Sequence, residues 1–142
     1  MSVEFLEKYN GILRGVMQWE NLDDLWSAIR GQKGEGWYIY SPGHALPEKL
    51  ADSEELDHFI SRMDTLLREE HDEDYCGIVY TDDFSNPALV KIFDPNNLGT
   101  SCGSSKTPSQ PGWIMSRNKP VPLGTDIVLS GKRKQWWSRL WN

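Results

Sequence analysis

Cys102 and His44 are the residues whose side chains are best suited to catalysis in this chain of 142 residues. Cys102 lies in a polar stretch beside Gly103 and near Lys106, whose positive charge would favour the reactive thiolate. A thiol enzyme also needs a base, and His44 is the candidate because the other two histidines fall within a predicted helix. Since nothing in the sequence brings His44 to Cys102, a thiol-dependent enzyme or redox protein is an alternative and not the leading interpretation.

The stretch around Cys102 also contains the glycines and serines whose backbone amides form anion-binding sites. Its spacing does not match a nucleotide-binding P-loop, because three residues instead of four separate Gly99 from Gly103, and Lys106 does not directly follow the second glycine. Binding of a small anion or a nucleotide by residues 95–112 is therefore a further alternative. A plain connecting loop is the other reading of this long segment.

We predict no metal centre and no cofactor. The two cysteines and three histidines include no Cys-x-x-Cys or His-x-x-x-His pair that would form half of a zinc site. The acidic run 69–74 lacks the alternating oxygen ligands and the glycine of a calcium loop. We expect that run to be a solvated helix end.

A basic, tryptophan-rich tail occupies residues 131–142. On a helix, one face of this tail would hold four apolar residues: Trp136, Trp137, Leu140 and Trp141. Such a face predicts docking into an apolar groove of a protein partner, peripheral contact with a membrane, or packing against the chain's own domain. In the last case its cations would meet the acidic region 48–74. The sequence leaves all three open and ranks the membrane below the protein partner.

Charge is distributed unevenly along the chain. Residues 1–95 carry eight basic and 20 acidic residues, a net charge of −12, whereas residues 96–142 carry seven basic residues and a single acid, a net charge of +6. The acidic total opposes general nucleic-acid binding, which depends on a basic surface. No secretory signal or membrane-spanning run is visible, so a cytoplasmic location with reduced thiols is expected.

Three helices are predicted to position these residues. Apolar residues recur at helical spacing from Phe5 to Val16 and again from Leu22 to Ile29, with Asn21 as the expected N-cap, which indicates an N-terminal helical pair. The strongest signal is over 53–71. There a capping box of Asp52 and Glu55 precedes an apolar stripe: Leu56, Phe59, Ile60, Met63, Leu66 and Leu67.

Short β-rich runs lie between and after the helices. They cover residues 37–40, 76–80, 88–93, 113–115 and 127–129, and the second and third read as an antiparallel hairpin. Together these elements predict an α+β fold, a small and mostly antiparallel sheet packed against the amphipathic helix 53–71. Residues 1–130 would form one domain that contains the 95–112 loop, followed by the tail.

The leading functional hypothesis is a small cytosolic binding or accessory protein without catalytic activity. An acidic surface, the 95–112 loop and the aromatic, basic tail would together recognise a macromolecular partner, most plainly another protein. Complementary charge would guide the encounter and buried tryptophans would anchor the complex. In this hypothesis the binding residues are those of the apolar tail face, together with Cys102, Gly103 and Lys106.

Overall fold

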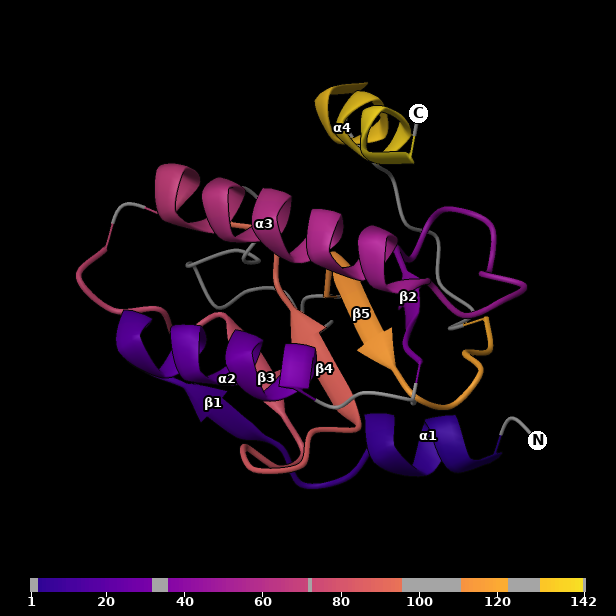
Figure 1. The fold of residues 1–142 in the computed structure, drawn as a ribbon, viewed down its shortest axis with the longest axis horizontal. Coiled ribbons are helices and arrows are strands. Elements are labelled where there is room, and N and C mark those ends of the chain that lie inside the picture. Colours follow the sequence, from indigo (N-terminus) through magenta and orange to yellow (C-terminus); the bar gives the residue numbers. More distant parts are fainter. Residues whose placement is uncertain (1–2, 32–35, 72, 96–110, 123–130, 142) are drawn as a thin grey trace, which may run out of the picture.

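The computed structural model describes residues 3–31, 36–71, 73–95, 111–122 and 131–141 (Figure 1). In chain order its elements are α1 (Val3–Tyr9), β1 (Arg14–Val16), α2 (Trp19–Gly31), β2 (Tyr38–Tyr40), α3 (Ser53–Glu70), β3 (Val79–Thr81), β4 (Leu89–Ile92), β5 (Trp113–Ser116) and α4 (Gly131–Trp141). The strands form a single antiparallel sheet in the order β1-β3-β4-β5-β2. The predicted α+β fold with a small antiparallel sheet is confirmed.

Helices α2 and α3 lie alongside one another and cover one face of the sheet (Figure 1). The two helices are joined by polar contacts, since Arg30 bonds to Asp57 at 2.7 Å and the Trp26 indole donates to Asp64 at 3.1 Å. The stripe predicted for α3 faces this layer, with Phe59, Ile60, Met63, Leu66 and Leu67 buried. Alternate residues along the strands, such as Val79, Val90 and Met115, pack against the two helices and complete the main core.

The opposite face of the sheet carries a smaller apolar cluster under α1. There Phe5 packs with Tyr40, Leu89 and Ile114, all of them buried. Alternation along β4 explains the division, because Leu89 points to the α1 side whereas Val90 and Ile92 point to the α2 and α3 side. Helix α1 therefore covers the part of this second face that β2, β4 and β5 form.

Local sequence sets the limits of α3. The side chain of Asp52 accepts the Glu55 backbone N–H at 2.8 Å, and the side chain of Glu55 accepts the Asp52 backbone N–H at 3.0 Å, so the predicted capping box is confirmed. The helix ends at Glu70, and the backbone N–H of the C-cap residue His71 bonds to the Leu67 carbonyl. The predicted range 53–71 thus exceeds the helix by its cap alone.

The N-terminal prediction was wrong in extent. Helix α1 ends at Tyr9, and Arg14–Val16 is strand β1, paired with β3. Glycine interrupts the predicted helix, and Gly15 allows the Tyr80 ring to lie within 3.2 Å of where a β-carbon would stand. The buried, β-branched Val16 pairs with Val79 instead of completing a helical face.

Three further predictions differ in detail, and a fourth cannot be compared. The run predicted as a strand over 76–80 joins the sheet only from Val79, where β3 begins. Asn21 lies inside the first turn of α2, where its side chain accepts the Gln18 backbone N–H at 3.3 Å, so it is not the N-cap. Trp37 precedes β2 and forms an isolated bridge with Ala51. The strand predicted over 127–129 lies outside the described residues.

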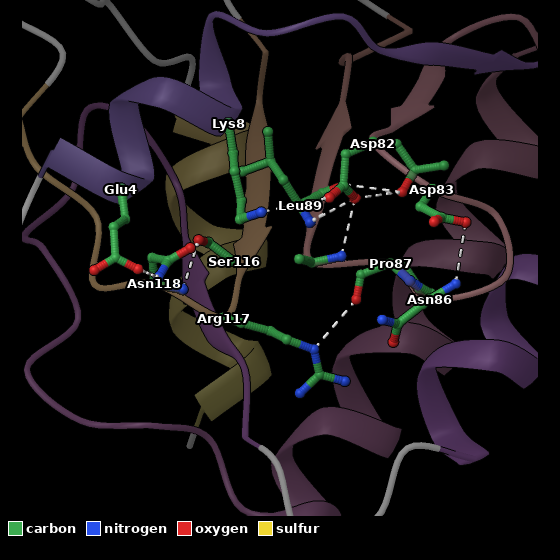
Figure 2. Close-up of polar contacts among 12 residues, drawn as sticks. Glu4, Lys8, Asp82, Asp83, Asn86, Pro87, Leu89, Ser116, Arg117 and Asn118 are labelled. Carbon is green, nitrogen blue, oxygen red and sulfur yellow. Dashed lines mark hydrogen bonds and ion pairs between the residues drawn. The ribbon is translucent and has the colours of Figure 1, made fainter.

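Polar contacts hold α1 and the β3–β4 loop to the ends of the strands (Figure 2). Oδ1 of Asp82 accepts the backbone N–H groups of Ala88 and Leu89 at 2.9 and 3.1 Å, which closes the hairpin loop. Asn118, just after β5, donates to Glu4 of α1 at 3.1 Å. Because these side chains are engaged with the backbone and with one another, this cluster is structural.

Candidate functional site: the groove beside α4

The tail predicted from the sequence is helix α4, and it packs against the body of the protein. Leu140 is buried in the main core cluster with α2, α3 and the sheet. The three tryptophans of α4 are partly buried, and each has a ring of the body beside it. Between ring centroids, Trp136 lies 5.4 Å from Trp113 and Trp137 lies 5.4 Å from His44. The ring of Trp141 stacks parallel to that of Phe59, with their centroids 6.4 Å apart.

Arg133 anchors the first turn of α4. Its guanidinium is 6% exposed and bonds to both oxygens of Asp94 at 2.7 and 2.8 Å, and to both oxygens of Glu70 at 2.7 and 3.3 Å. Burial alone would lower the pKa of Arg133, but the bonds to the two carboxylates outweigh burial and raise the pKa above its ordinary value. The guanidinium therefore stays charged and links α4 to α3 and to the residue after β4.

An apolar groove lies between α4 and the chain that follows β2. We call it the α4 groove. Its volume is about 240 Å³, and it is lined by Ile39, Ala45, Pro47, Glu48, Lys49, Leu50, Ala51, Glu55, Trp137 and Trp141. Leu50 is 45% exposed, and the rings of Trp137 and Trp141, which also line the groove, meet edge to face with their centroids 5.3 Å apart. The groove thus has an apolar interior and charged side chains on the 45–55 rim.

His44 lies beside the α4 groove, under the ring of Trp137. Burial lowers the pKa of His44, and the nearby positive charge of Lys134 lowers it further, while a hydrogen bond with the Ser41 backbone opposes both effects. Within the described residues Nδ1 of His44 is buried and has no hydrogen-bond partner. The lowered pKa favours the neutral imidazole, whose ring packs against the ring of Trp137.

The structure places some of the residues predicted from the sequence at the groove and others away from it. His44, Trp137 and Trp141 meet at or beside the groove, while Leu140 faces the core and Trp136 packs on Trp113. Cys102, Gly103 and Lys106 lie outside the described residues, so thiol chemistry and anion binding by residues 95–112 stay predictions.

Sequence reasoning missed the other wall of the groove and the anchoring role of Arg133. The signal for the wall was weak, because Ala45, Pro47, Leu50 and Ala51 follow neither helical nor strand spacing. The signal for Arg133 was hidden, because it is one of three consecutive basic residues and only the structure shows which of them is buried.

The described part of the chain holds no cluster of three or more histidine, cysteine or acidic residues placed to bind a metal ion. None of its helices is both long enough and apolar enough to cross a membrane. The free thiol of Cys76 is buried in the core, where burial raises its pKa above the ordinary value, so it is an unreactive packing residue.

Comparison with known proteins adds no relative: no family model, no curated protein and no solved structure matches the chain.

Proposed function

We propose that this is a small cytosolic binding protein without catalytic activity, which recognises a partner protein by holding one of its apolar side chains in the α4 groove. The observation that carries the proposal is the pair of aromatic rings, Trp137 and Trp141, that line the groove together with the exposed Leu50. Apolar and aromatic side chains in a concave site are the residues that supply most of the energy in protein interfaces.

The anchoring of α4 supports this role. Arg133 and Leu140 attach the helix to the body near its two ends. Trp137 lies between these two residues and Trp141 follows Leu140, and both tryptophans stay partly accessible. A wall attached in this way is already ordered before a ligand arrives. Binding then costs less conformational entropy than it would if a free tail had to become ordered.

The size of the groove favours a protein side chain over a cofactor. Sites for small molecules and cofactors are typically about 300–1,000 Å³. The α4 groove, at about 240 Å³, is smaller than that range and suits one or two apolar side chains. A cytosolic location agrees with the buried free thiol of Cys76, because unpaired cysteines are usual in reducing compartments.

Selection from a phage-displayed library of random peptides tests the proposal. We expect the wild-type protein to enrich peptides that share a large apolar residue, and Leu50→Lys to lose their binding because it introduces a charge into the apolar wall. Thermal unfolding of the variant should match the wild type, since Leu50 is 45% exposed.

Met17→Lys is the matched control, because Met17 is similarly exposed at 53% and does not line the groove. This variant should keep the selected peptides. The proposal is wrong if no peptide is enriched, or if the enriched peptides bind Leu50→Lys as well as they bind the wild type.

A further inference from the structure

Building on the proposed function, we infer that the α4 groove selects an apolar side chain carried by a basic segment of the partner. The inference rests on the charges of the groove's rim. The first is Glu48, an exposed residue that lines the groove, and the second is Glu55, which lines it from the first turn of α3. An apolar side chain held in the groove brings its neighbours in the partner chain toward these lining carboxylates.

The acidic character continues beyond the lining itself. From Glu48 to Asp57 the chain carries five acidic residues and one basic residue, Lys49. Asp52 and Glu54 are exposed next to the groove, while Asp57 is paired with Arg30. The whole chain has a net charge of −6, which adds a general attraction for cations.

The exposed cations of α4 do not line the groove: Lys132, Lys134 and Arg139. Lys134 lies one helical turn before Trp137, and its positive charge contributes to the lowered pKa of His44. Among the residues that line the groove, two are acids, Glu48 and Glu55, and one is a base, Lys49. The lining therefore carries one more acid than base, and this excess favours a basic segment over an acidic one.

Rim charges of this kind change affinity modestly. An exposed ion pair contributes about 0.2–1 kcal/mol, which corresponds to a factor of up to about five in affinity. Such pairs act mainly on the rate of encounter and on the choice between partners. The apolar side chain therefore supplies most of the affinity, and the charges of the rim decide which partner is preferred.

Two synthetic peptides with blocked ends test the inference. Both carry the same pair of leucines, flanked in one by lysines and in the other by glutamates, and binding is followed by NMR shifts of the Trp137 and Trp141 indole N–H groups. We expect the lysine peptide to bind about two- to fivefold more tightly in low salt. The preference should disappear in about 1 M salt, where charges are screened within about 3 Å.

Charge reversals on the two rims give opposite expected results. Glu48→Lys should weaken binding of the lysine peptide about two- to fivefold, and Lys134→Glu should strengthen it by a similar factor. Glu20→Lys, an equal change of charge at an exposed position on α2 outside the groove, should have a smaller effect.

The possible outcomes separate the two proposals. If both peptides bind through the groove equally well, or if the glutamate peptide binds more tightly, the basic partner is wrong and the proposed function stands. The inference also fails if Glu20→Lys weakens binding as much as Glu48→Lys, because the effect would then be one of net charge. If neither these peptides nor any library peptide binds in a way that depends on Leu50, the proposed function itself is wrong.

Discussion

At the scale of single residues, Arg133 has the greatest influence on how the two halves of the chain meet. It is 6% exposed, and its partners Asp94 and Glu70 have side chains that are 12% and 22% exposed. Buried ions are tolerated only when their charges and hydrogen bonds are matched. The geometry meets this condition, because both carboxylates accept two bonds each from the guanidinium.

Removing the Arg133 side chain should therefore lower the free energy of unfolding more than removing an ordinary surface charge does. We expect Arg133→Ala to lower the free energy of unfolding by about 3–5 kcal/mol, because it leaves the Asp94 carboxylate buried without its counter-charge. Urea denaturation measures the change. Lys132→Ala is the control, since the Lys132 side chain is 67% exposed and its 3.5 Å contact with Glu70 should contribute less than about 1 kcal/mol. Equal effects of the two variants would contradict this account of Arg133.

His44 supplies a second prediction at this scale, because its pKa in the folded protein lies below the ordinary value of 6.5. The unfolded chain therefore takes up the proton first as the pH falls. Folding stability contributed by neutral His44 is present above pH 6.5, declines as the pH falls below that value, and reaches its minimum once the folded form is also protonated.

Two measurements check the direction of this pH dependence. The imidazole signals of His44 should titrate below pH 6.5 by NMR, and Lys134→Gln should raise that pKa by removing a like charge. His44→Gln should lose less stability than the wild type between about pH 7 and pH 5. A His44 pKa above 6.5 would contradict the burial that the structure shows.

At the scale of elements, the helices with a complete local signal were predictable. For α3 the capping box and the apolar stripe agreed, and the structure confirms both. The first segment carried a conflict, because its helical spacing ran through Gly11 and Gly15. Pairing with β3 decided in favour of a strand, and no local pattern in residues 14–16 reports a partner that lies more than 60 residues away.

The attachment of α4 gives a prediction that belongs to this scale. Leu140→Ala should lower the free energy of unfolding by about 2–4 kcal/mol, because Leu140 is 4% exposed in the core cluster shared with α2, α3 and the sheet. Ser138→Ala, on the exposed side of the same helix, should change it by less than about 0.5 kcal/mol. A negligible effect of Leu140→Ala would mean that α4 does not pack on the body in solution.

At the scale of the whole molecule, the uneven charge of the sequence has a structural consequence. The basic C-terminal helix lies against acidic residues of the first 95 positions, with Arg133 and Lys132 on Glu70 and Arg133 on Asp94. Lys134 and Arg139 are exposed. Part of the positive charge is thus used to attach α4, and part remains on the surface beside the α4 groove.

The sequence by itself determined the α+β class, the range and cap of α3, the β3–β4 hairpin and the apolar face of the tail. These depend on periodicity, capping and turn residues, which act over a few positions of the chain. The tertiary structure alone decided that residues 14–16 form an edge strand, that Arg133 and not its neighbours is buried, and that Leu50 lines a groove together with Trp137 and Trp141. Each of these joins segments far apart in sequence, and such pairings are set by packing and burial in the complete fold and leave no local pattern.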